Sequence, residues 1–286
     1  MIATIESLAS AGEPAPPQPP SRVEELQQTV SASRLGLWHT CRLKFYFRYV
    51  LRLQKPPTPA LHVGKVVHAV LQAWNMARWR KEPFALERFR GRFDLGWREE
   101  NQGAVINWDG EEEAQRSTAW SMLETYFAET PIRADERPEA VEVRVEASLA
   151  EHGLPLLIGI LDLVRDGSRI VDFKTAGKTP DAKHAEHLHE TQLSCYSVLY
   201  RDATGKRELG RELHHLVKLK TPKLVVTTLG PMTDNQEARL FRSMESYVEG
   251  LARKDFVPSP GFHCAGCEYF GECRSCAAWT GKEVDD

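Results

Sequence analysis

The chain has 286 residues, of which 42% are hydrophobic and 27% charged, and its formal net charge is −3 at pH 7. This length accommodates one large domain or two small ones, with enough apolar residues for a buried core. No run of about 18 apolar residues could form a membrane helix, and no basic start precedes an apolar segment, so we expect a soluble, cytoplasmic protein.

Both ends of the chain predict disordered tails. The first, residues 1–22, contains the proline-rich segment Glu13–Pro20, and the second covers residues 280–286. Proline-rich and strongly polar segments cannot bury enough apolar surface to fold. We therefore expect one folded domain over residues 23–279.

The first half of the domain predicts helices. Ser33 is a suitable N-cap for a helix that ends near Cys41, and the aromatic, basic segment 45–49 continues it. An apolar stripe predicts a second helix over 64–80. Residues 82–135 are expected to be a mostly helical insertion, with a helix over 111–129 and a loop near 101–110.

One charge pattern stands out in this half. Residues 26–81 contain no Asp or Glu but ten Lys and Arg. A field of one sign favours a polyanionic partner, because each neutralised phosphate releases counterions. A basic dimer face or a simply solvated face would show the same pattern.

The second half predicts strands. Alternating apolar residues indicate a strand over 141–149, and two further strands cover 155–164 and 169–174. A helix follows at 184–200, then a hairpin over 213–219 and 224–228, and an amphipathic helix over 234–252. This order indicates an α/β or α+β domain.

The hairpin over 155–174 carries the most distinctive chemistry. Its turn lies at 166–168, and Asp172 and Lys174 share one face of the second strand, with Asp162 alongside on the first. Two close carboxylates repel each other unless a cation neutralises them. Two acids and a lysine beside a divalent metal are the groups that a metal-dependent phosphodiesterase uses. The alternative is an ordinary salt-bridged, half-exposed hairpin.

The chain has six cysteines, and an intracellular chain favours metal over disulfides for them. One set of four, Cys264, Cys267, Cys273 and Cys276, is local and would suit zinc. Another replaces Cys276 with the distant Cys41 and would join the two ends of the domain. Cys195 lies apart in a predicted helix, and unpaired surface thiols remain the third interpretation.

Taken together, these motifs resemble the PD-(D/E)XK nuclease superfamily, in particular its RecB-like branch with a four-cysteine 4Fe–4S cluster. That branch includes the nuclease domain of AddB and the iron–sulfur exonucleases associated with CRISPR systems. The matching segments occur in the family's order: Ser31–Tyr49 with Cys41, Gly64–Leu71 with His68, Gly159–Asp162, Asp172–Thr175, Gln192–Tyr196, and the cysteines Cys264, Cys267 and Cys273. The family often has a proline directly after the first cluster cysteine, where this chain has Arg42. Cys276 is an additional cysteine that the family pattern does not contain.

The resemblance implies a restriction-endonuclease-like fold, a central mixed sheet flanked by helices. It further implies that residues 82–135 form a helical insertion. Residues 31–50 and 258–279 would form a cluster-binding subdomain, with the 4Fe–4S cluster held by Cys41, Cys264, Cys267 and Cys273. The expected role of this cluster is structural.

The resemblance also assigns roles in the active site. His68, Asp162, Asp172 and the Phe173 carbonyl would bind Mn²⁺ or Mg²⁺, with Mn²⁺ favoured by the imidazole. Lys174 would orient or deprotonate the attacking water. Gln192 would support the geometry or touch the phosphate, and Tyr196 would pack behind it or stack near a base.

The expected activity is that of a DNA exonuclease acting on duplex ends or single strands, the latter through aromatic stacking at 45–49. A helicase or integrase is an expected partner, in recombination, repair or CRISPR adaptation, and the chain itself has no ATP-binding Gly-x-x-x-x-Gly-Lys-Ser/Thr loop. The alternative is a non-catalytic or zinc-stabilised nucleic-acid-binding subunit.

Overall fold

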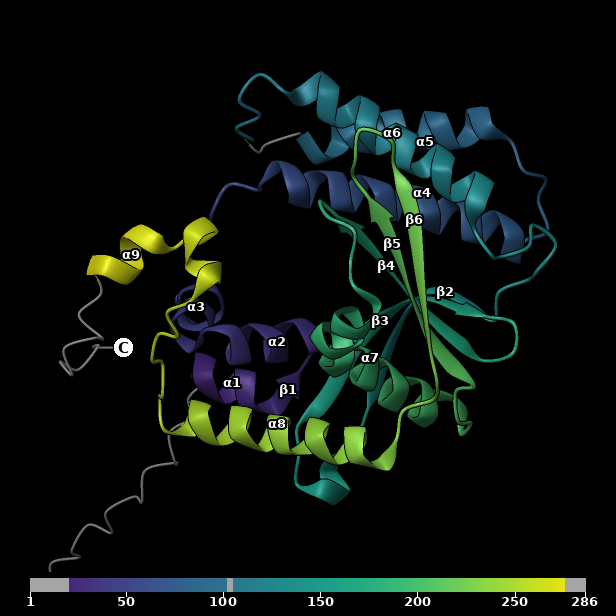
Figure 1. The fold of residues 1–286 in the computed structure, drawn as a ribbon. Coiled ribbons are helices and arrows are strands. Elements are labelled where there is room, and N and C mark those ends of the chain that lie inside the picture. Colours follow the sequence, from purple (N-terminus) through teal and green to yellow (C-terminus); the bar gives the residue numbers. More distant parts are fainter. Residues whose placement is uncertain (1–20, 102–104, 276–286) are drawn as a thin grey trace, which may run out of the picture.

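The computed structural model describes residues 21–101 and 105–275. Across these residues, a six-stranded sheet of parallel and antiparallel strands has helices on both faces (Figure 1). This confirms the predicted α/β class with a central mixed sheet. The predicted tails lie outside the described residues, except that Ser21 and Arg22 begin the first helix and are not part of a tail.

The strand order in the sheet is β1-β3-β4-β5-β6. Strands β1 and β4 pair with different parts of one edge of β3, and β2 pairs with the opposite edge. Pairing is parallel for β1–β3 and β4–β5 and antiparallel for the rest. The strands are β1 (Thr29–Val30), β2 (Ala140–Ala147), β3 (Leu156–Arg165), β4 (Arg169–Ala176), β5 (Gly210–Val217) and β6 (Lys223–Leu229). Both predicted hairpins are present, β3–β4 and β5–β6.

One face of the sheet is covered by α4 (Pro59–Trp79) and α6 (Glu112–Glu129), with α5 (Leu86–Asn101) packed against α4. The α4 helix begins five residues before the predicted start, because Thr58 caps it and Pro59 occupies the first turn. Their apolar residues form one core with the sheet residues Leu163, Val171, Phe173 and Leu216.

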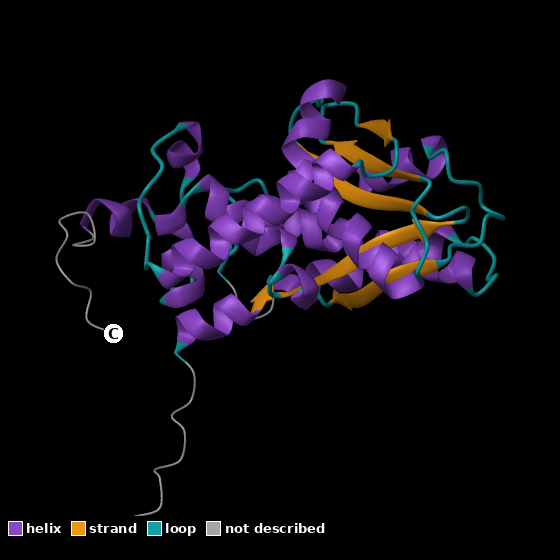
Figure 2. Cartoon of the chain, turned by 90° about the horizontal axis from the view of Figure 1, so that it is seen from below, coloured by secondary structure: helices purple, strands orange, loops and turns teal. Residues whose placement is uncertain are grey.

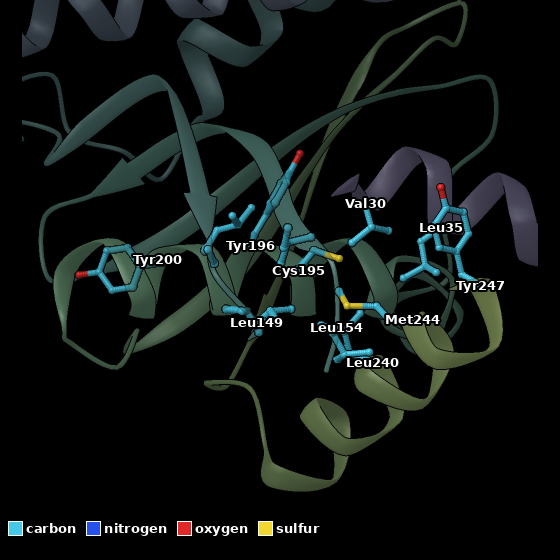
Figure 3. Close-up of a cluster of buried hydrophobic side chains, with 14 of the residues drawn as sticks. Val30, Leu35, Leu149, Leu154, Cys195, Tyr196, Tyr200, Leu240, Met244 and Tyr247 are labelled. Carbon is cyan, nitrogen blue, oxygen red and sulfur yellow. The ribbon is translucent and has the colours of Figure 1, made fainter. Parts of the chain in front are cut away.

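The opposite face is covered by α7 (Ala182–Thr204), which packs on β2, β3, β4 and β6 and in turn contacts α8 (Asp234–Ala252). The α8 bounds are those predicted. A second core lies here (Figure 3), and a short 3₁₀ turn, η2 (Ala150–His152), follows β2. Cys195 lies within this core, where burial raises the pKa of its thiol to about 12, so it is a structural residue.

The N-terminal segment contains α1 (Arg22–Gln28), α2 (Ala32–Thr40), α3 (Arg42–Phe45) and a π-helical turn, η1 (Tyr46–Val50). Neither α1 nor β1 was expected. The α1 helix begins with a capping box, in which Ser21 accepts from the Glu24 N–H and the Glu24 carboxylate accepts from the Ser21 N–H. This Ser-x-x-Glu pattern is visible in the sequence and would have predicted the helix.

Chain segments far apart in sequence meet beside α3 in a region that we call the clip: residues 41–55 together with 255–275. The latter segment contains η3 (Phe262–Gly266) and α9 (Phe270–Ser275). Three ion pairs cross the clip: Arg42–Asp255, Lys44–Glu268 and Lys55–Glu272. In Figure 2 the strands gather in one half of the molecule, and the other half is formed mainly by helices.

The aromatic residues at 45–49 serve the protein interior. Phe45, Tyr46 and Phe47 are at most 6% exposed. The Phe45 ring packs edge-on against Trp38, and the Phe47 ring lies 5.7 Å from that of Tyr269. The prediction that these rings stack on bases is therefore wrong for these three residues, because stacking needs an open ring face and these rings are covered by other side chains.

No helix among residues 21–101 and 105–275 is long and apolar enough to cross a membrane.

Candidate active site

The candidate site lies in a fork between β3 and β4. The two strands pair only from Leu163↔Val171 to the turn, while β1 pairs with β3 at Leu156 and Leu157. Both neighbours lie on the edge of β3 away from β2, so residues 158–162 have no strand partner on that edge. The two predicted acids, Asp162 and Asp172, lie where the fork opens.

The chain changes direction locally to turn Asp162 into this fork. Leu161 packs in the core under α7, whereas Leu163 packs in the core under α4, although alternate residues of a regular strand share a face. Across from Asp162, Glu142 of β2 has φ 48°, in the left-handed region, and the register is the same on both sides of it. Such a local twist redirects a side chain without ending the sheet.

Asp172 and Lys174 are held by Gln192 of α7. The Lys174 Nζ donates to Gln192 Oε1 at 2.7 Å and lies 2.8 Å from Asp172 Oδ2. The Gln192 amide donates to Asp172 Oδ1 at 3.0 Å and to the Tyr196 hydroxyl at 2.9 Å. Both amide hydrogens and the amide oxygen of Gln192 are therefore engaged, which fixes the carboxylate and the ammonium relative to each other.

Tyr196 is the last member of this network, and its hydroxyl accepts a hydrogen bond from the Gln192 amide. Figure 3 shows its ring at the border of the core under α7, with the hydroxyl directed away from the other labelled side chains. Burial raises the pKa of Tyr196 above its usual range, and the charges of Asp172 and Asp162 raise it further. The hydroxyl thus stays protonated. At 7% exposure the ring packs and does not stack on a base.

Asp162 and His68 form the other side of the fork. The Phe173 N–H donates to Asp162 Oδ2 at 3.0 Å, and His68 Nδ1 of α4 lies 3.6 Å from the same oxygen. Burial raises the pKa of Asp162 well above its usual range, and the charge of Asp172 adds to this. Burial lowers the pKa of His68. A second negative charge is therefore costly in this fork without a cation.

The donor set fits a hard divalent cation. Asp172 is 1% exposed and pairs with Lys174, so ionisation of Asp162 would place a second negative charge in the fork, and the raised pKa of Asp162 reflects this cost. Within the described residues, however, no three His, Cys, Asp or Glu side chains are gathered closely enough to form a coordination shell as they stand. The carboxylates instead contact Lys174, Gln192 and the Phe173 N–H.

Two residues that the sequence did not indicate lie beside Lys174. His215 of β5 is in register with Lys174, and its ring centroid is 5.6 Å from that of His189 on α7. Burial lowers the pKa of both imidazoles, that of His215 to about 4. The parallel pairing of β4 with β5 brings them here, and no local motif in the sequence reveals such a pairing.

The predicted cluster cysteines gather only in part. Cys41, Cys267 and Cys273 contact one small apolar cluster that is centred on Tyr269, whose hydroxyl donates to the Leu53 carbonyl at 2.9 Å. Cys264 lies in the neighbouring 3₁₀ turn, half-buried. Cys276 lies outside the described residues.

The basic stretch 26–81 is largely neutralised in the folded chain. Six of its ten cations form ion pairs with acids from outside the stretch: Arg42, Lys44, Arg52, Lys55, Arg78 and Arg80. The charge pattern in the sequence therefore overstates the field that this segment presents, because four of these cations pair with acids distant in sequence and two pair with Glu25 and Glu82, which flank the stretch.

Comparisons with known proteins identify a family and a fold. A family model described as the PD-(D/E)XK nuclease superfamily matches residues 29–274. The chain is also similar to a crystal structure from Eubacterium rectale named "Putative exonuclease", with a TM-score of 0.59 and 14% identity over 92% of this chain and 91% of that chain. At this identity the likeness shows the fold.

A more distant likeness is to the crystal structure of SSO0001, with a TM-score of 0.35 and 14% identity over 81% of this chain and 93% of that chain. This TM-score is too low to show a shared fold. No curated protein matches the chain.

Proposed function

Because the chain belongs to the PD-(D/E)XK nuclease superfamily, we propose that it is a metal-dependent DNA nuclease whose active site is the β3–β4 fork. The observation that carries this proposal is the network in which Gln192 engages Asp172, Lys174 and Tyr196 at once. A buried carboxylate and ammonium fixed in this way, beside a second carboxylate that needs a cation, suit phosphodiester hydrolysis.

The residues that would hold Mn²⁺ or Mg²⁺ are His68, Asp162, Asp172 and the Phe173 carbonyl. When bound, such a cation supplies positive charge to the two carboxylates and Lewis acidity toward a phosphoryl oxygen. The superfamily uses divalent metals of this kind. The imidazole of His68 makes the donor set softer than carboxylates alone, which favours Mn²⁺.

The chain's own groups would perform the remaining steps. Lys174 donates one N–H to Gln192 and forms an ion pair with Asp172, and a remaining N–H can orient the attacking water. Gln192 keeps the ammonium in place, and Tyr196 holds the Gln192 amide. Neither Gln192 nor Tyr196 needs to touch the substrate for this role, so both are positioning residues.

We further propose that the clip holds a structural 4Fe–4S cluster on Cys41, Cys264, Cys267 and Cys273. Three of these cysteines contact one apolar cluster around Tyr269, and sulfur ligands in an apolar setting suit such a group. The ion pairs of the clip already bring the two ends of the domain together. Iron and sulfide analysis of protein purified without oxygen tests this, and stoichiometric zinc with no iron would contradict it.

The choice of DNA, and of ends or single strands, is tested with end-labelled substrates. The purified protein is incubated with Mn²⁺ and linear or circular DNA, single- or double-stranded, and with RNA of the same sequence. Loss of linear DNA with circles intact is expected. Cleavage of RNA alone would contradict the proposed substrate. If a folded preparation cleaves none of these substrates, the protein is a non-catalytic binding subunit and the proposal fails.

A further inference from the structure

A pair of histidines extends the polar surface of the fork on the side away from Asp162. Strands β4 and β5 are parallel with Lys174 opposite His215, so these two side chains lie on the same face of the sheet, under α7. From α7, His189 comes one turn before Gln192, the residue that binds Lys174. The pair therefore borders the same ammonium that serves the fork.

This pair has hydrogen-bonding capacity that the described chain does not use. His215 is 4% exposed, and its Nδ1 is buried without a hydrogen-bond partner. A buried polar atom without a partner costs free energy, so such an atom beside an active site calls for a specific reason.

The charge around the pair favours an anion over a metal cation. Lys174 lies alongside, and its ammonium would repel a second cation but attract an anion. The nearby acids have other partners: Asp172 binds Lys174 and Gln192, and Glu190 binds Arg239. An anion can thus accept hydrogen bonds from the imidazole N–H groups, next to the positive charge of Lys174.

We propose that His189 and His215, together with Lys174, form a subsite for the phosphate next to the scissile one. This rests on the proposed nuclease function, because the scissile phosphate is placed in the fork. Adjacent strands of a sheet are about 4.8 Å apart, so a group over β5 is displaced from the β3–β4 fork by the order of one nucleotide step. The pair would thereby fix the register of the DNA strand on the enzyme.

The test combines a change in the protein with a change in one phosphate. His189→Phe, His215→Phe and the double variant keep a ring of similar size but remove its nitrogen atoms. His187→Phe, an exposed histidine on the same helix, is the matched control. The substrates are oligonucleotides in which each phosphate in turn is replaced by an uncharged methylphosphonate, and thermal unfolding verifies that each variant folds.

For the wild type and the control, we expect one methylphosphonate next to the cleaved bond to lower kcat/KM roughly 10-fold, as expected for lost hydrogen bonds to a charged group. The double variant should lose a similar factor on the natural substrate, mainly in KM, and show no further loss with that methylphosphonate. If the two losses multiply, or if the variants match the control on all substrates, the histidines do not bind this phosphate.

A second measurement separates this inference from the proposed function. Binding of the same oligonucleotides is measured without divalent metal, where no cleavage occurs. If the wild type fails to cleave any DNA but one methylphosphonate weakens its binding and not that of the double variant, the nuclease proposal fails and the phosphate subsite stands. If no single methylphosphonate distinguishes the two proteins in binding or cleavage, the subsite is wrong.

Discussion

The fork and the clip both join segments that are distant in sequence, but they are held in different ways. In the fork, Asp172 is 1% exposed and each polar atom of Gln192 is bound by another site residue. In the clip, the ion pair Lys44–Glu268 is 21% and 29% exposed, and surface pairs of this kind contribute only about 0.2–1 kcal/mol each. The fork is therefore held by the sheet and α7, whereas the described contacts of the clip are partly exposed ion pairs and one small apolar cluster, to which the proposed 4Fe–4S cluster would add.

Because of this difference, we expect substitutions in the fork to lower activity while the protein stays folded. Substitutions in the clip should lower the stability of the protein more than its activity. The following variants break or sharpen this contrast, beginning with the largest expected effect.

Lys174→Met should lower kcat/KM by roughly 10³-fold. The N–H that orients the attacking water is lost, which raises the activation free energy by a few kcal/mol. The variant also leaves Asp172 buried without its ammonium. Added Mn²⁺ should therefore raise its melting temperature more than that of the wild type. Equal rates for the variant and the wild type would remove Lys174 from the mechanism.

Gln192→Leu should lower kcat by about 10- to 100-fold, the usual cost of losing a group that orients site residues. Tyr196→Phe, which removes only an acceptor for the Gln192 amide, should cost less. Steady-state kinetics of both variants gives the ordering. If Tyr196→Phe is the more damaging change, the hydroxyl has a role of its own and the positioning argument is wrong.

Cys41→Ser should remove iron from the protein and lower the melting temperature of the clip, while the fork keeps its geometry. The initial rate on short oligonucleotides should then fall by less than about 10-fold at a temperature where the variant is folded, since Cys41 packs in the cluster with Tyr269, whereas Tyr196 and Phe173 of the fork belong to two other clusters. Cys195→Ser, a change in a core thiol, is the control and should retain iron. Full iron retention by Cys41→Ser would exclude Cys41 as a ligand.

The smallest expected effect concerns pH. The pKa of Asp162 is raised in the folded chain above its ordinary value of 3.8, so the folded state binds the extra proton more tightly than the unfolded one. In metal-free protein this group therefore destabilises the fold increasingly as pH rises from about 4 toward its raised pKa. Asp162→Asn should make the melting temperature depend less on pH over this range, with a difference from the wild type of about a few °C. An unchanged slope would show that Asp162 does not carry this charge.

The sequence predicted the features that depend on local pattern. The β3–β4 hairpin with Asp162, Asp172 and Lys174 and the α8 bounds follow from alternation, a turn and an amphipathic period. It failed where distant segments decide the outcome. Phe45, Tyr46 and Phe47 looked available for bases, but Trp38 and Tyr269 bury them.

The same limit explains why parts of the site were missed. His215 becomes a neighbour of Lys174 only through the parallel register of β4 and β5, which no spacing in the chain encodes. Part of the charge of the basic stretch is likewise paired with acids that are distant in sequence, such as Asp255 and Glu268. By contrast, α1 was predictable from its capping box.

The most direct test of the nuclease assignment compares two acids of one hairpin. Asp172 lies in the fork, and Asp166 lies exposed in the turn of the same hairpin. Mn²⁺-dependent release of label from linear DNA is measured for the wild type, Asp172→Asn and Asp166→Asn. We predict activity in the wild type and Asp166→Asn, and none detectable in a folded Asp172→Asn. Equal activity of both variants would place the chemistry outside the fork and contradict the account.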